Sequence, residues 1–112
     1  MYMNEKTVLL IESGQFIGGV IRSLFTRCET LNVIEASPAS SRELIQLVNQ
    51  ARPQVVVLDD TVRADYLSHL LKYMRNSDGI RVVVVNTSSN QLEVYEKQQI
   101  PVRQTADFLA AL

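Results

Sequence analysis

Cysteine is almost absent from this chain, since Cys28 is the only one among 112 residues. A single thiol excludes an intramolecular disulfide framework and a cysteine-rich metal site. Cys28 falls at the end of an apolar helical pattern. A small buried or half-buried side chain is therefore favoured over a reactive thiol at this position.

The chain also lacks long apolar runs and an excess of either charge. No stretch approaches the roughly eighteen apolar residues of a membrane span, and residues 1–6 lack the apolar core of a signal peptide. Eleven basic and twelve acidic side chains give a net charge of −1, and the arginines are scattered rather than clustered. We therefore expect a cytoplasmic protein that contacts neither membranes nor nucleic acid.

The remaining composition is that of one ordinary globular domain. Apolar residues make up 46 % and charged residues 21 % of the chain, and no linker, internal repeat or low-complexity segment is visible. We predict a single domain over residues 1–112. The glycine pairs Ser13-Gly14 and Gly18-Gly19 match neither a dinucleotide-binding fingerprint nor a P-loop. Close packing of a helix is the favoured interpretation of Gly18 and Gly19.

Four short apolar runs predict strands at residues 7–11, 31–34, 55–58 and 80–85. The third and fourth runs are continuously apolar, which is typical of parallel strands covered on both faces. The segments between the runs show helical spacing of apolar residues. These are Phe16, Ile17, Val20, Ile21, Leu24 and Phe25; then Leu44, Leu47, Val48 and Ala51; then Leu67, Leu70, Leu71 and Met74.

Turn and capping residues separate these elements. The second helix can begin at Ser37-Pro38 or at a capping box formed by Ser40 and Glu43, and it ends before Pro53. Residues 76–79, Asn-Ser-Asp-Gly, end the third helix. The order predicts an α/β fold with a doubly wound, parallel, five-stranded sheet and helices on both faces.

The pattern changes after residue 85. A regular fourth helix is short or absent, and residues 91–102 alternate only roughly, which predicts an irregular fifth strand that is bent or forms a hairpin near residues 96–99. Pro101 is compatible only with an edge. We expect Thr105 to cap a last helix that carries Phe108, Leu109 and Leu112.

Polar residues follow three of the predicted strands, at the edge of the sheet where doubly wound folds bind ligands. Clustered carboxylates at such an edge can bind Mg²⁺, and a carboxylate can instead attack a phosphoryl donor. Alternatively, Asp59 and Asp60 are a solvated acidic pair at the end of a buried strand. The polar residues that follow the three strands are Glu12 and Ser13, then Asp59 and Asp60, then Asn86, Thr87 and Ser88.

The chain resembles, over nearly its whole length, the receiver domain of bacterial two-component response regulators. The resemblance is carried by VLLIES at 8–13, RPQVVVLD at 52–59, MR at 74–75 and VVVVNT at 82–87. It implies that Asp59 is a phosphoacceptor, that Glu12 and Asp59 bind Mg²⁺ weakly, and that Thr87 is the switch hydroxyl, although simple alignment places Asn86 at that position. It also implies a histidine kinase or another signalling protein as the partner.

Several receiver signatures are missing. Ser13 replaces the second acidic residue after the first strand, and no Lys-Pro pair follows the fifth. Lys97 is the only lysine nearby, and the sequence does not favour its reaching the site. A second hypothesis is therefore a degenerate receiver that signals through protein contacts alone, with residues 92–102 as an edge that binds a partner or forms a homodimer. No nucleophile and base pair supports an enzyme.

Overall fold

A computed structural model of the chain describes residues 6–11, 31–62, 64–77, 79–86, 89, 91–97 and 101–112. The helix predicted around Phe16 to Phe25 lies outside the described residues, as do Cys28 and the glycine pairs. The described elements, in chain order, are β1 (Lys6–Ile11), β2 (Leu31–Ala36), α2 (Ser41–Ala51), β3 (Val55–Asp59), α3 (Ala64–Met74), β4 (Arg81–Asn86), β5 (Gln91–Glu96) and α4 (Thr105–Ala110).

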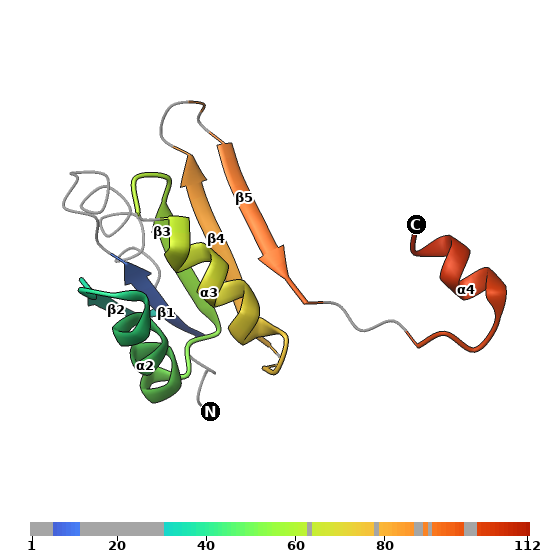
Figure 1. The fold of residues 1–112 in the computed structure, drawn as a ribbon, viewed down its shortest axis with the longest axis horizontal. Helices are drawn as coiled ribbons and strands as arrows, with labels where there is room; N and C mark the ends of the chain where they lie inside the picture. The colour runs from blue at the N-terminus through green and yellow to red at the C-terminus, as the bar shows by residue number, and fades with distance from the viewer. Residues whose placement is uncertain are drawn as a thin grey trace.

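The strands form one five-stranded sheet in the order β2-β1-β3-β4-β5 (Figure 1). The pairs β1–β2, β1–β3 and β3–β4 are parallel, whereas β5 runs antiparallel to β4. The prediction of an α/β fold is confirmed, but the prediction of a fully parallel sheet is wrong. The reason is the length of the connection, because only residues 87–90 join β4 to β5. A parallel return to the sheet needs a crossover of a dozen or more residues.

The fifth strand is also more regular than predicted. Its pairing with β4 runs without interruption from Asn86↔Gln91 to Arg81↔Glu96. The expectation of an irregular strand is therefore wrong over residues 91–96. Residues 98 and 99 of the bend predicted at 96–99 lie outside the described part. The prediction of a missing fourth helix agrees with the four-residue connection, which leaves no room for a helix that covers the sheet.

Helix α2 begins at the second of the two predicted starts. The Ser40 side chain accepts a hydrogen bond from the Glu43 amide at 3.2 Å, and the Glu43 carboxylate accepts one from the Ala39 amide at 3.2 Å. These bonds satisfy amides that the first turn of a helix leaves without partners. The helix ends at Arg52, which has left-handed backbone angles (φ 48°) and directly precedes Pro53.

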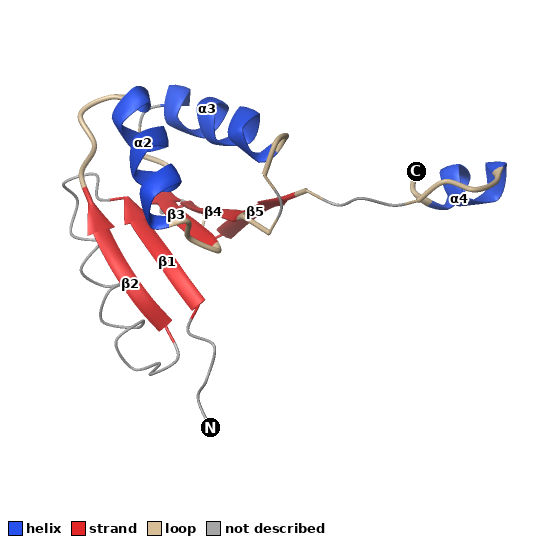
Figure 2. Cartoon of the chain, turned by 90° about the horizontal axis from the view of Figure 1, so that it is seen from below, coloured by secondary structure: helices blue, strands red, loops and turns tan. Residues whose placement is uncertain are grey.

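Helices α2 and α3 lie side by side on one face of the sheet (Figure 2). They bury alternate residues of the strands in the main core, among them Leu9, Val56 and Val82. On the opposite face Val8, Leu10 and Val57 are also buried. Burial on both faces explains why these strands are continuously apolar in sequence. Helices are predicted on both faces: α2 and α3 cover this one, the first predicted helix lies outside the described residues, and α4 does not lie on the sheet (Figures 1 and 2).

The C-terminal helix α4 lies apart from the sheet in both views (Figures 1 and 2). Its N-cap is Gln104 rather than the predicted Thr105, which is the first helical residue, and the Gln104 side chain makes no capping hydrogen bond. No helix within the described ranges combines the length and apolar character that crossing a membrane requires.

Candidate functional site at the carboxyl end of the sheet

Asp59 is the last residue of β3, which lies between β1 and β4 in the sheet. Its exposed fraction is 4 %, and it is the only buried charged side chain among the described residues. The chain leaves β1 toward β2 on one side and returns to β3 on the other, so the strand order reverses between β1 and β3. Ligands of open α/β sheets bind at such a reversal, outside the carboxyl ends of the strands.

Thr61 holds the carboxylate of Asp59. The Thr61 amide donates a hydrogen bond to Asp59 Oδ1 at 2.9 Å, and the Thr61 hydroxyl donates a second one to the same oxygen. The backbone reinforces this turn, because the Val62 amide donates to the Asp59 carbonyl at 3.2 Å. The carboxylate is therefore oriented by the loop that leads into α3.

The neighbouring strand ends beside this turn. Asp59 pairs in register with Val85, and the Asp60 amide donates to the Val85 carbonyl at 3.0 Å. Asn86, the last residue of β4, is half-buried, and its side-chain oxygen accepts a hydrogen bond from the Ser89 amide at 3.2 Å. The structure thus brings Asp59, Asp60 and Asn86 to one edge of the sheet, as the sequence predicts.

Four of the residues predicted at this edge lie outside the described part of the chain, among them Ser13 and Ser88. Glu12, the expected second Mg²⁺ ligand, directly follows β1 in sequence, and Thr87, the expected switch hydroxyl, directly follows β4. Within the described residues no group of three His, Cys, Asp or Glu side chains is placed to hold a metal ion. The adjacent carboxylates of Asp59 and Asp60 are the acidic donors described at this edge.

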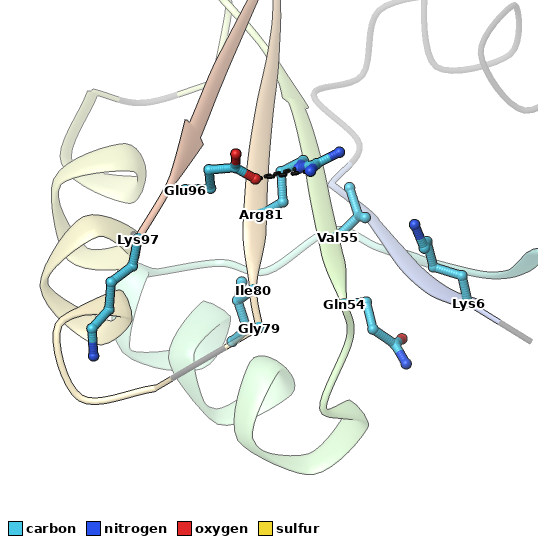
Figure 3. A pocket seen from close by; sticks show the side chains of 8 residues that line it. All are labelled: Lys6, Gln54, Val55, Gly79, Ile80, Arg81, Glu96 and Lys97. Carbon is cyan, nitrogen blue, oxygen red and sulfur yellow. Dashed lines mark hydrogen bonds and ion pairs between the residues drawn. The ribbon is translucent and has the colours of Figure 1, made fainter. Parts of the chain in front are cut away.

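Lys97 lies at the wrong end of the sheet for chemistry at Asp59. Because β5 is antiparallel, it ends beside Arg81, where β4 begins, and Figure 3 shows Lys97 at this amino end. The Lys97 ammonium donates a hydrogen bond to the Arg75 carbonyl at 3.0 Å. The length of β3 separates the two ends of the sheet by roughly 13 Å. A role for Lys97 at the carboxylate is therefore not supported.

The amino end of the sheet contains a cavity of about 270 Å³ (Figure 3). Lys6, Gln54 and Lys97 are among its lining residues. Its Arg81 guanidinium forms an exposed ion pair with Glu96, with an Nη2–Oε2 distance of 2.8 Å. Of the three cationic side chains that line the cavity, those of Arg81 and Lys97 have partners within the protein.

The sequence did not identify Thr61 as the partner of Asp59. The available signal was the spacing, because an aspartate often accepts a hydrogen bond from the backbone amide two residues later. His69 on α3 is exposed, and its Nδ1 lies 2.7 Å from the Asp65 carbonyl oxygen.

Comparisons with protein-family models, with curated proteins and with solved structures found no match to this chain.

Proposed function

We propose that the chain is a receiver-like domain of phosphorelay signalling in which Asp59 accepts a phosphoryl group from the phosphohistidine of a kinase. The observation that carries the proposal is the position of Asp59. It is a buried carboxylate at the end of a central parallel strand, beside the reversal of strand order. A charged group is rarely buried without a task or a partner, which makes this residue the leading candidate for chemistry. Such a relay would operate in the cytoplasm.

The proposed reaction is a transfer between two nucleophiles. An oxygen of Asp59 attacks the phosphorus, the bond from phosphorus to the imidazole nitrogen breaks, and the imidazole, which is protonated on its other nitrogen, leaves as a neutral group with the electron pair of the broken bond. The product is an acyl phosphate on Asp59. Thr61 fixes the orientation of the carboxylate through hydrogen bonds to Oδ1. A neutral phenol or amide would be a weaker nucleophile in this reaction, because it lacks the negative charge of a carboxylate.

Mg²⁺ fits the chemistry of the donors at this edge. Carboxylates are hard oxygen ligands, and Mg²⁺ is usually held by one or two of them together with water and substrate phosphate. Asp59 and Glu12 are the residues proposed to hold the ion, which when bound neutralises part of the negative charge on the transferred group. No further protein cation is assigned to the site, because Lys97 lies at the other end of the sheet.

The proposal is tested by incubating the protein with Mg²⁺ and acetyl phosphate and measuring the intact mass. We expect the mass to increase by one phosphoryl group, with no increase in Asp59→Asn. Asp60→Asn is the matched control, because it removes the adjacent exposed carboxylate, and it should keep the modification. Equal labelling of wild type and Asp59→Asn, or no labelling of either, would contradict the proposal.

A second candidate is a receiver-like interaction module that is not phosphorylated. Two observations favour it: the only lysine near the end of the fifth strand lies far from Asp59, and large apolar side chains are exposed on β5 and α4. In this case Asp59→Asn would leave partner binding unchanged, whereas charged substitutions of Leu92 and Val94 would abolish it.

A further inference from the structure

Two cavities share a wall at the amino end of the sheet, the end opposite to Asp59. The first, of about 270 Å³, lies where β1, β3 and β4 begin and β5 ends (Figure 3). The second, of about 510 Å³, lies at the C-terminal ends of α2 and α3. We call them the strand cavity and the helix cavity; their shared wall consists of Gln54, Gly79 and Ile80. Small-molecule sites usually have volumes of about 300 to 1,000 Å³, so the two together have room for a small ligand.

The strand cavity presents a cationic side chain on each side of Val55. Strand register places Lys6, Val55 and Arg81 on one face of the sheet, with Val55 between the two cations (Figure 3). The Lys6 ammonium has no hydrogen bond or ion pair with a described residue. The Arg81 guanidinium binds one oxygen of Glu96 through Nε at 2.9 Å and Nη2 at 2.8 Å, and it keeps Nη1 as a donor. Because Arg81 neutralises Glu96, the charge of Lys6 is not balanced by the residues that line the cavity.

Gln54, in the shared wall, is held in place by the neighbouring strands. Its amide donates to the Thr7 carbonyl at 2.9 Å, and its carbonyl accepts from the Arg81 amide at 2.8 Å. Its side-chain Oε1 accepts a hydrogen bond from the Thr7 amide at 2.7 Å, which leaves the Nε2 group as a donor. The wall therefore offers a preformed neutral donor beside the cations.

The backbone of the shared wall offers a second neutral donor. Gly79 has φ 82°, and open space surrounds the position of the side chain that it lacks. The amide of the next residue, Ile80, donates to no described residue. Backbone amides next to a glycine in this conformation can approach an anion closely. An ammonium, a guanidinium and backbone amides are the donors that proteins use to hold phosphate.

The helix cavity has a different chemistry, because most of its polar lining is neutral. The Tyr73 hydroxyl donates to Asn49 Oδ1 at 2.7 Å, so Asn49 keeps its Nδ2 donor, and Ser77 adds a hydroxyl. The Arg52 guanidinium has no described partner, and the described lining contains no acidic side chain. The last carbonyls of α2 and α3 carry partial negative charge, which disfavours an anion and accepts hydrogen bonds from hydroxyl groups. This cavity therefore suits a hydroxylated group without charge.

We propose that the two cavities bind a sugar phosphate, with the phosphate group in the strand cavity and the sugar in the helix cavity. Lys6 and the Ile80 amide bind the phosphate oxygens, and Asn49 and Ser77 bind the sugar hydroxyls. A phosphate monoester carries about two negative charges at neutral pH, which is why a cavity lined by cations favours it. The site lies at the other end of the sheet from Asp59 and does not depend on phosphoryl transfer there.

Isothermal titration calorimetry tests the site with the full chain and D-glucose phosphorylated at its exocyclic hydroxyl. EDTA is present, so that no metal ion at Asp59 contributes. We expect saturable binding, and Lys6→Gln should weaken it by at least about tenfold, since it removes a charge-assisted hydrogen bond. Lys72→Gln makes the same change at an exposed position of α3 that lines neither cavity, and it should bind as wild type does. The absence of binding at millimolar ligand, or equal weakening in both variants, would overturn the proposal.

Three further compounds define the ligand class. Glucose lacks the charge, inorganic phosphate lacks the hydroxylated part, and succinate lacks the tetrahedral group. Each should therefore bind at least about tenfold more weakly than the sugar phosphate. Succinate or glucose of equal affinity would overturn the assignment of a phosphate group to the strand cavity. Inorganic phosphate of equal affinity would overturn the assignment of a sugar to the helix cavity.

Amide chemical shifts in the NMR spectrum locate the bound ligand independently of its affinity. Saturation with the sugar phosphate should move the amide signals of Gln54, Gly79 and Ile80 most. The largest shifts at residues 59–62 would place the ligand at the other end of the sheet and would overturn the site. Because none of these measurements involves phosphorylation of Asp59, a failed ligand site and a failed phosphoacceptor are distinguishable results.

Discussion

Thr61 donates two hydrogen bonds, from its amide and from its hydroxyl, to the same carboxylate oxygen of Asp59. Bonds of this kind to a charged acceptor are stronger than bonds between neutral groups. They connect the end of β3 to the loop that leads into α3, so any change in the charge of the carboxylate acts first on this loop. The pair is the structural core of the candidate site.

Thr61→Val should destabilise the protein. It removes the hydroxyl donor and leaves the amide donor, at a carboxylate that is buried. The loss of a hydrogen bond to a charged group predicts a decrease of about 1.5 to 3 kcal/mol in the free energy of unfolding. Urea titration at neutral pH measures it. Thr61→Ser keeps the hydroxyl and should lose clearly less; equal losses in both variants would show that the hydroxyl is not the cause.

Arg52→Gly should be more stable than Arg52→Ala. Arg52 has φ 48° at the C-terminal cap of α2, and its amide donates to the Val48 carbonyl at 2.9 Å. Both variants remove the same side chain interactions, but only glycine adopts this left-handed conformation without strain, which predicts a difference of about 1 kcal/mol. Chemical denaturation compares the two variants, and equal stability would argue against strain at this cap.

Tyr66→Phe should lower the free energy of unfolding more than Tyr73→Phe does. The Tyr66 hydroxyl donates to the buried Pro38 carbonyl at 2.9 Å, whereas the Tyr73 hydroxyl donates to the exposed Asn49 side chain at 2.7 Å. Removing the buried donor leaves an acceptor without water, which predicts a loss of about 1 to 2 kcal/mol, against less than about 0.5 kcal/mol at the exposed pair. Thermal and urea unfolding measure both. A larger loss at Tyr73 would contradict this assignment.

Tyr95 should titrate above its ordinary range. A hydrogen bond from its hydroxyl to Glu93 at 2.7 Å, then desolvation, then the negative charge of Glu93 raise its pKa above about 10. A raised pKa favours the neutral phenol in the folded state. Its stabilising contribution is therefore complete below about pH 10 and is lost as the pH rises through the folded-state pKa.

The ultraviolet absorbance of phenolate measures this titration as the difference between wild type and Tyr95→Phe. In a Glu93→Gln background the charge is gone, so the midpoint for Tyr95 should move down toward 10. An unchanged midpoint would show that Glu93 is not the cause.

Local signals in the sequence predicted the elements well. The apolar run at 55–58 predicts β3 to within one residue, because a strand buried on both faces needs such a run. The Ser40 and Glu43 pair marks the start of α2, because capping depends on side chains adjacent in sequence. The prediction that Thr105 caps α4 was wrong. A threonine is suited to the first turn of a helix as well as to the cap, and the neighbouring residues do not distinguish the two positions.

The direction of β5 was missed because apolar alternation is the same for parallel and antiparallel strands. The length of the connection is the signal that distinguishes the two directions. Four residues join β4 to β5, which is too few for the crossover that a parallel strand requires. The position of Lys97 away from Asp59 agrees with the sequence analysis, which did not favour its reaching the site. Its distance from Asp59 depends on strand direction, which no motif around the lysine encodes.

The sequence predicted the central residue of the candidate site, Asp59, but not Thr61, the residue that contacts its carboxylate. Asp59 follows from the strand that precedes it, since the end of a parallel strand fixes the position of the next side chain. Thr61 depends on how the following loop turns, which the strand pattern does not specify.

The central claim is that Asp59 is a phosphoacceptor, and identification of the modified residue tests it most directly. Borohydride reduces an aspartyl phosphate to homoserine, so the protein treated with acetyl phosphate and Mg²⁺ is reduced, digested and sequenced by mass spectrometry. We predict homoserine at position 59 and an unchanged aspartate at position 60. Unmodified Asp59 under conditions that label a known receiver domain, or homoserine only at other positions, would contradict the account.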